Sequence, residues 1–350
     1  MRSAVYTHGL PLAAALVAAA TLACRPTDGP VRLSETRRAM GVPWTITLFA
    51  PSGPAGRAAL AAAFAEVDRL EDILSDYDPM SEVSRLSAAA PMPAAVAVGP
   101  DLWRVLERSV AFREASGGAF DPTVGPLTTL WRQARQTGRL PRPEKLTAAL
   151  AAVGPQALEL DPRRQAVRLP QPGSRLDFGG IGMGYAADRV LDLLRGRGIT
   201  AALVDASGDV AVAGRPPGSG GWRVAVRGLV GAVDEPAIIT VADAAVTTSG
   251  DAFQAVQIDG VRYSHIVDPR TGLGVVGPTA VTVIAADCTA ADALATAASV
   301  LGPRGGADLL ARFPGTAARF VWLEEGRPRE HTTPTWPAPP AQSAAGTGQP

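Results

Sequence analysis

The stretch CTAADALATAASVLG, Cys288–Gly302, predicts the helix around which the rest of the chain is organised. Alanine is the strongest helix former, and Leu294, Ala298 and Leu301 recur at intervals of three and four residues, as on one helix face. Thr289 is a candidate cap for the start, and the terminal glycine, which is followed by proline, is a stop signal. The pattern therefore predicts one helix with an apolar face.

Two polar residues of this helix, Asp292 and Thr296, are four positions apart and therefore share a face. A carboxylate and a hydroxyl in that arrangement could bind a hard cation such as Mg2+, which prefers oxygen ligands and keeps several waters. The alternative is structural: Asp292 would interact with the helix dipole, and Thr296 would hydrogen-bond to its own helix. Spacing alone leaves both interpretations open.

The composition is that of a globular protein with a sizeable core. The chain has 350 residues, 47% hydrophobic and 19% charged, which suffices for one large or two smaller domains. Basic and acidic residues number 33 each, and aromatic residues make up 5%. No net charge therefore attracts nucleic acid, and no basic stripe is interleaved with aromatic residues. We expect no nucleic-acid partner.

Residues 1–24 have the features of an export signal. A positive start at Arg2 precedes the apolar run Leu10–Ala23, which is shorter than the roughly 20 residues that span a bilayer. Small residues lead to Cys24, which resembles a bacterial lipoprotein signal, in which the cysteine is acylated; ordinary cleavage is the alternative. Residues 25–34 would then be a tether, and the protein would lie on the periplasmic side of a bacterial membrane.

Helices dominate the first half of the remaining chain and strands the second. Trp44–Phe49 alternates apolar residues with threonine, as a strand does, and Ala55–Ser75 is an amphipathic helix. From about Gln156 the pattern favours strands. Residues 331–350 are rich in proline, alanine and threonine, which predicts a disordered tail.

A glycine cluster after residue 178 joins a predicted strand to a helix. The strict dinucleotide fingerprint G-x-G-x-x-G is not present among these glycines. A laxer form ending in alanine occurs at Gly182, Gly184 and Ala187, with Asp205 downstream. A Rossmann-type site is therefore an alternative to weigh.

His265 is the only histidine between the predicted signal and the predicted tail. A lone histidine is more often structural than catalytic. Upstream of it, TTSGD at Thr247–Asp251 offers hydroxyls and a glycine turn that suit phosphate oxygens. No nucleophile-elbow pattern surrounds the serines, so a hydrolase triad finds little support.

Taken in order, these segments resemble the ApbE family, the FAD:protein FMN transferases. The resemblance runs from about Met40 to about Phe320, and it rests on the order of the segments more than on any one of them. The segments are Met40-Gly41, Ser75–Ser87 around Tyr77, Gly118–Pro122 (GAFDP), Asp177–Asp188 (DFGGIGMGYAAD), Val204–Asp209 (VDASGD), Thr247–Asp251, Ser264–Gly272 (SHIVDPRTG) and Ala291–Ala297 (ADALATA).

The resemblance implies an α+β fold over residues 35–330: two intertwined subdomains with mainly antiparallel sheets, flanked by helices, with an FAD cleft between them. It implies that FAD is the substrate and that Mg2+ is required. FMN would be attached by a phosphoester bond to Thr or Ser of an exported flavoprotein, and AMP would be released.

By motif position, the resemblance also implies site residues. The Mg2+ ligands would be Asp292, Thr296 and the backbone carbonyl of Gly180. FAD contacts would come from Met40, Tyr77, Ala119, Phe120, Asp121, Asp177, Met183, Ser249 and Ile266. The catalytic residues would be Asp292 and His265, the latter as general base or as a group that orients the phosphates; Asp251 and Asp268 are alternative bases.

Position 183 departs from the family pattern, because relatives often carry lysine or an acid where this chain has methionine. Tyr77 could stack on the flavin or adenine ring, or it could be a buried tyrosine with a bonded hydroxyl. Two other functions are weighed: an FAD pyrophosphatase that releases FMN and AMP, and a non-catalytic flavin-binding lipoprotein. The presence of both Asp292 and Thr296 favours an enzyme.

Overall fold

The computed structural model describes residues 29–226, 228–229, 237–250 and 255–337. The predicted signal, Cys24 and the alternative base Asp251 lie outside these residues. Within the described ranges, no helix has the length and apolar character needed to cross a membrane.

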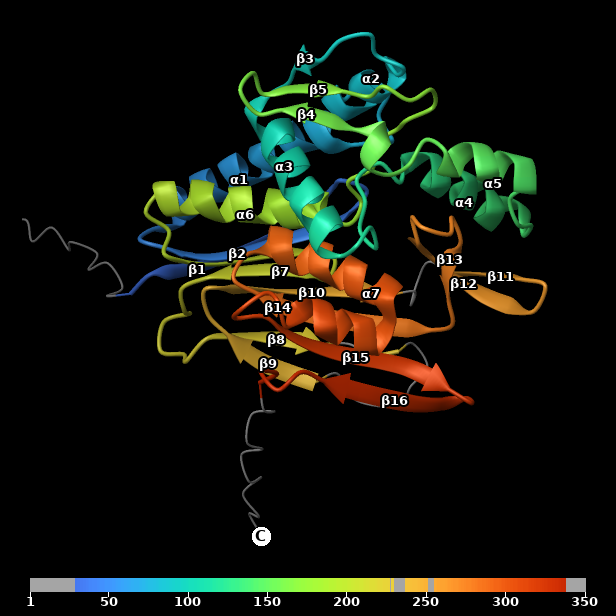
Figure 1. The fold of residues 1–350 in the computed structure, drawn as a ribbon. Coiled ribbons are helices and arrows are strands. Elements are labelled where there is room, and N and C mark those ends of the chain that lie inside the picture. The colour runs from blue at the N-terminus through green and yellow to red at the C-terminus, as the bar shows by residue number, and fades with distance from the viewer. Residues whose placement is uncertain (1–28, 227, 230–236, 251–254, 338–350) are drawn as a thin grey trace, which may run out of the picture.

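The fold is built on an 8-stranded sheet that runs through the lower half of Figure 1. Every neighbouring pair of strands is antiparallel. The strands, in their order across the sheet, are β1 (Val31–Ala39), β2 (Val42–Ala50), β6 (Ala201–Ala206), β7 (Asp209–Ala213), β10 (Ala244–Gly250), β14 (Thr279–Ala285), β15 (Ala317–Glu324) and β16 (Arg327–Thr332).

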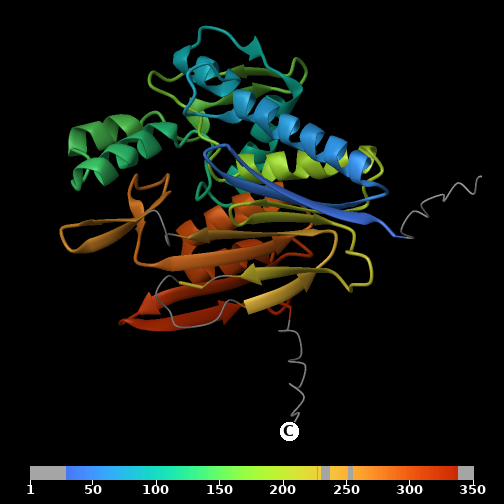
Figure 2. The ribbon, with the colours of Figure 1, turned by 180° about the vertical axis from the view of Figure 1, so that it is seen from behind.

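Helices cover one face of this sheet and a strand pair covers the other (Figures 1 and 2). Helices α1 (Gly53–Leu74), α6 (Gly182–Gly196) and α7 (Cys288–Leu310) pack their apolar sides against it and form the main core. On the opposite face, β8 (Trp222–Val226) and β9 (Ala237–Val241) bury a second apolar cluster. The central strands are therefore covered on both sides.

The chain leaves the large sheet four times and returns to it each time; two of these excursions form the β8–β9 pair, between β7 and β10, and α7, between β14 and β15. Between β2 and β6 it builds α1, α6 and the upper part of Figure 1. That part contains α2 (Glu82–Ala88), α3 (Pro100–Ala115), α4 (Gly125–Thr137), α5 (Pro143–Leu150), the 3-10 turn η1 (Pro155–Ala157) and a small sheet of β3 (Val96–Ala97), β5 (Ala166–Arg168) and β4 (Glu159–Asp161). Between β10 and β14 it forms a sheet of β11 (Ala255–Ile258), β12 (Val261–Val267) and β13 (Gly274–Val276), which packs on α4 and α5. The predicted α+β fold with intertwined subdomains is confirmed.

Both ends of α7 differ from the prediction. The N-cap is Asp287, whose carboxylate accepts a hydrogen bond from the amide three residues on, at 2.7 Å. The predicted cap, Thr289, is wrong because its hydroxyl donates to Asp188 at 2.5 Å. At Gly302, φ is 73° and ψ is 178°, and helical residues follow it, so the predicted stop is a break within α7.

Ordered strands extend beyond the predicted limits of the folded part. β1 begins at Val31, inside the expected tether, because it pairs with β2 along its whole length. β16 ends at Thr332, inside the expected disordered tail, because its pairing with β15 continues to the pair Arg319–Thr332.

Candidate functional site

The three predicted metal-binding residues meet where α6 approaches α7. A Cβ atom placed on Gly180 would lie 2.7 Å from the hydroxyl oxygen of Thr296. One turn along, the Gly184 amide donates to the Asp292 carboxylate at 3.3 Å. The hydroxyl of Ser249, on β10, lies 3.3 Å from that of Thr296. Segments far apart in the sequence thus place oxygen atoms in one small region.

The approach of the two helices requires glycine at position 184. A Cβ atom there would lie 2.3 Å from the Cys288 carbonyl oxygen and 3.0 Å from the Asp292 Cβ. Asp188, one turn further along α6, accepts hydrogen bonds from the Cys288 and Thr289 amides at 2.8 and 2.9 Å. These contacts fix the position of α7 along α6.

Two buried carboxylates, Asp292 and Asp209, lie at this contact, and the charged side chains that affect their pKa values are other carboxylates. Asp292 is 3% exposed, and burial, with the charge of Asp209 adding to it, raises the pKa of Asp292 well above its ordinary value. Asp209, on β7, is 6% exposed; burial raises its pKa to about 7, and nearby Asp205 contributes. Each carboxylate is costly to ionise without a nearby positive charge. This environment favours a bound cation.

These residues fit Mg2+. Asp292 and Thr296 supply a carboxylate and a hydroxyl, and the Gly180 backbone lies against Thr296. In the described part of the chain, no group of three or more His, Cys, Asp or Glu side chains is arranged to hold a metal. Mg2+ needs no such group, since it commonly binds through one or two carboxylates, substrate phosphates and water.

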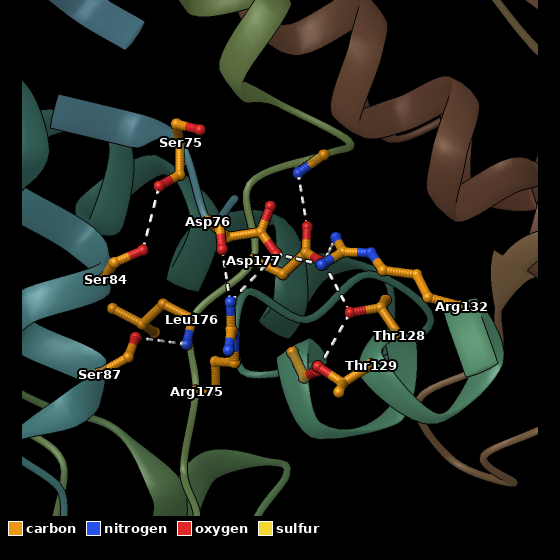
Figure 3. Close-up of polar contacts among 12 residues, drawn as sticks. Ser75, Asp76, Ser84, Ser87, Thr128, Thr129, Arg132, Arg175, Leu176 and Asp177 are labelled. Atoms are coloured by element: carbon orange, nitrogen blue, oxygen red, sulfur yellow. Dashed lines mark hydrogen bonds and ion pairs between the residues drawn. The ribbon is translucent and has the colours of Figure 1, made fainter. Parts of the chain in front are cut away.

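A second polar cluster surrounds Asp177 (Figure 3). Its carboxylate accepts hydrogen bonds from the Thr128 hydroxyl at 2.7 Å, the Arg132 guanidinium at 3.2 Å and the Gly179 amide at 2.8 Å. The last bond holds the turn that carries Gly180. The predicted FAD contact Asp177 is therefore tied to the predicted metal site through the backbone.

A cavity of about 430 Å3 lies elsewhere, between α3, α6 and the start of α7. Its lining includes Arg108, Asp188 and Asp287, and it contains none of the predicted FAD or metal residues. The cavity is therefore separate from the candidate site.

Comparison with known proteins identifies the family. A model of the ApbE family matches residues 40–320. The FAD:protein FMN transferase of Treponema pallidum (strain Nichols) is 35% identical over 283 residues, which is 77% of this chain and 78% of that protein. The chain belongs to the ApbE family. The matched range agrees with the predicted resemblance.

Solved ApbE structures share the fold. The flavin transferase ApbE from Vibrio cholerae aligns with a TM-score of 0.79 at 27% identity and covers 87% of this chain and 98% of that one. The Pseudomonas stutzeri flavinyl transferase ApbE, in its apo form, has a TM-score of 0.77 at 31% identity and covers 87% and 96%. The Rossmann alternative is thereby excluded.

In this ApbE chain, the GAFDP segment is mostly buried. Ala119 and Phe120 are 1% and 4% exposed, so a ligand could reach their backbone but hardly their side chains. The Asp121 carboxylate accepts hydrogen bonds from the amide and hydroxyl of Thr123 at 2.8 and 2.6 Å. Burial raises the pKa of Asp121, and these bonds oppose the rise. The segment shapes the site more than it offers side chains to it.

The remaining predicted residues come from several elements. Met40, in the β1–β2 turn, has a φ of 48°, and its amide donates to Glu71 at 2.7 Å. Met183 is half-buried in the first turn of α6. His265 and Ile266 are half-buried on β12, a strand that contacts α7. Their roles toward FAD stay predictions.

The geometry decides one alternative from the sequence and describes the surroundings of another. Tyr77 is 76% exposed, so it is no buried tyrosine. Asp268 forms an ion pair with Arg270 at 2.9 Å, and its role as an alternative base stays a prediction.

Arg132 and Asp209 lie at the candidate site but are not among the residues predicted from the sequence. Arg132 lies in no family motif, and only the packing of α4 brings it to Asp177. Asp209 ends VDASGD, one of the segments that carry the family resemblance, but its closeness to Asp292 depends on the pairing of β7 with β10.

Gly184→Ala should lower the free energy of unfolding by about 1–3 kcal/mol, because the added methyl would overlap the start of α7. Thermal unfolding measures the loss. Gly196→Ala is the matched control in the same helix, since no atom lies within 4 Å of its Cβ position. Equal melting temperatures for the two variants would contradict the close approach of α6 and α7.

Asp209→Asn should remove a pH dependence of stability from the metal-free protein. The folded pKa of Asp209, about 7, exceeds the ordinary value of 3.8, so the folded state binds the proton more tightly. The free energy of unfolding then falls as pH rises between those values and is level above them. In the wild type, we expect the free energy of unfolding to decrease by on the order of 1–3 kcal/mol over this pH range. We expect this decrease to be absent from Asp209→Asn.

Chemical denaturation with a chelator present, at about pH 4.5 and about pH 8, measures this fall. Asp68→Asn, at an exposed position of α1, is the control. A variant with the pH slope of the wild type would show that Asp209 does not carry the effect.

Proposed function

We propose that this chain is an FAD:protein FMN transferase that requires Mg2+ and modifies Thr or Ser of an exported flavoprotein, releasing AMP. The observation that supports this most is the convergence of Gly180, Asp292 and Thr296 at the contact of α6 with α7. Its relatives from Treponema pallidum and Vibrio cholerae carry the name FAD:protein FMN transferase.

In the proposed reaction, the acceptor hydroxyl oxygen forms a bond to the phosphorus of FMN. The bond from that phosphorus to the bridging oxygen breaks, and AMP leaves with this oxygen. Asp292, Thr296 and the Gly180 carbonyl would hold Mg2+, which when bound neutralises charge on the pyrophosphate.

Other residues would position the reactants and move the proton. The Ser249 hydroxyl, next to Thr296, would donate a hydrogen bond to a phosphate oxygen. His265 would take the proton of the attacking hydroxyl or orient the phosphates. Asp177 would keep the Gly180 turn in place through its bond to Gly179.

The proposal includes export and a lipid anchor on Cys24. Because β1 begins at Val31, only residues 25–30 would link the anchor to the fold. A chain of that length reaches roughly 20 Å when fully extended. The catalytic domain would therefore work close to the membrane surface, and its acceptor would have to present its hydroxyl there.

The purified protein, given FAD and Mg2+, should attach FMN to Thr or Ser of a suitable flavoprotein domain, and mass spectrometry detects the added FMN. Asp292→Asn should reduce the rate by at least ~100-fold, because it removes the only charged ligand proposed for the metal. Asp192→Asn, at an exposed position of α6, is the matched control.

Other outcomes would indicate other functions. Free FMN and AMP formed without any acceptor would indicate an FAD pyrophosphatase. FAD binding with neither product, tested with several acceptor domains, would indicate a non-catalytic flavin-binding lipoprotein.

Thr296→Val should weaken Mg2+ binding by roughly tenfold, because it keeps the shape of the side chain but removes the oxygen. The Mg2+ concentration for half-maximal turnover and the Mg2+-dependent rise in melting temperature both report it. Thr296→Ser retains the oxygen and is the control. An unchanged Mg2+ titration in the valine variant would remove Thr296 from the ligand set.

A further inference from the structure

Arg132, on α4, reaches toward Asp76 and Asp177 in Figure 3, and it contacts two predicted FAD-binding residues, Asp177 and Tyr77. Its guanidinium donates to Asp76 at 2.6 Å and to Asp177 at 3.2 Å. The guanidinium carbon also lies 4.1 Å from the centre of the Tyr77 ring, in the geometry of a cation–π contact. One side chain thus joins an aromatic ring to a buried carboxylate.

The two acids depend on this guanidinium. The side chains of Asp76 and Asp177 are 9% and 6% exposed. Burial, reinforced by the charge of Asp177, raises the pKa of Asp76, and Arg132 opposes the rise. Without Arg132, two buried carboxylates would face each other, and Arg175, 3.8 Å from Asp76, would be the cation left in the cluster of Figure 3. They would separate or take up a proton.

Tyr77 is held on one face and open on the other. At 76% it is the most exposed of the large hydrophobic side chains in the described ranges. Arg132 covers one face of its ring. Because Arg132 already restricts the Tyr77 ring, the ring loses little conformational freedom when a flat ligand stacks on its opposite face.

We propose that Arg132 is a positioning residue for FAD. It fixes the stacking face of Tyr77 relative to Asp177, which in turn holds Gly179 and the turn that carries Gly180. Arg132, together with the Thr128 hydroxyl that also holds Asp177, thereby sets the distance between the Tyr77 ring and the Gly180 turn. The inference rests on the proposed function, since it takes FAD as the ligand.

A double-mutant cycle on the full chain tests this, with FAD affinity measured by fluorescence titration. Arg132→Gln and Tyr77→Leu should each weaken FAD binding by roughly five- to twentyfold, and the double variant should be little weaker than either. Arg132→Lys keeps the charge beside Asp177 but loses the flat stacking surface, so its affinity should be intermediate. Arg139→Gln, at an exposed position just beyond α4, should bind FAD like the wild type.

Competition by FMN and by ADP shows which ring of FAD stacks on Tyr77. Weaker binding of one of them in Arg132→Gln supports the inference, and unchanged binding of both overturns it. Additive effects of the two substitutions also overturn it. Should Arg132→Gln not fold, Arg132→Lys takes its place in the cycle with Tyr77→Leu.

Measurements on the wild type separate this inference from the proposed function. If the wild type binds FAD but transfers no FMN, the proposed function is overturned, and the double-mutant cycle still tests the role of Arg132 in FAD binding. A wild type that binds no FAD overturns both.

Discussion

The close contact of α6 with α7 is the constraint on which the candidate site depends. The contacts repeat at four-residue steps in the sequence: Asp188 receives the first turn of α7, Gly184 meets Asp292, and Gly180, in the turn before α6, meets Thr296. Since four residues make about one helical turn, Asp292 and Thr296 lie on one side of α7, and Gly184 and Asp188 lie on one side of α6. A single register, fixed at Asp188 and permitted by glycine, therefore delivers all the proposed metal ligands together.

The large sheet explains why residues so distant in sequence meet there. The chain returns to the sheet after each excursion, and β7, β10 and β14 lie beneath α6 and α7. Ser249 and Asp209 reach the helix contact from β10 and β7. Under the proposed function, the sheet supplies the floor of the site, and α4 and the segment around Tyr77, from the excursion between β2 and β6, form the side that binds the rings of FAD.

Residue spacing predicted several features that one element carries, whereas features that need two elements came from the family resemblance or were missed. Asp292 and Thr296 share a face because of helical periodicity, which is local. Thr289 and Asp287 are both competent caps, and the choice between them follows from Asp188, more than ninety positions away. Arg132 is 45 positions from Asp177 and 56 from Asp76, so no spacing rule connects them. Family motifs point to residues that would touch the ligand, but not to those that hold them in place.

Charge divides the site into two unlike halves. In the half proposed to bind the rings of FAD, the ring-binding half, Asp76 and Asp177 are paired with arginines, so their arrangement is complete without a ligand. In the half proposed to bind the metal, the metal half, burial and neighbouring carboxylates raise the pKa values of Asp292 and Asp209. A pyrophosphate, itself anionic, would be repelled by these acids unless a cation lay between them. The ring-binding half can therefore be preformed for the nucleotide, whereas under the proposed function the metal half binds the phosphates only together with its cation.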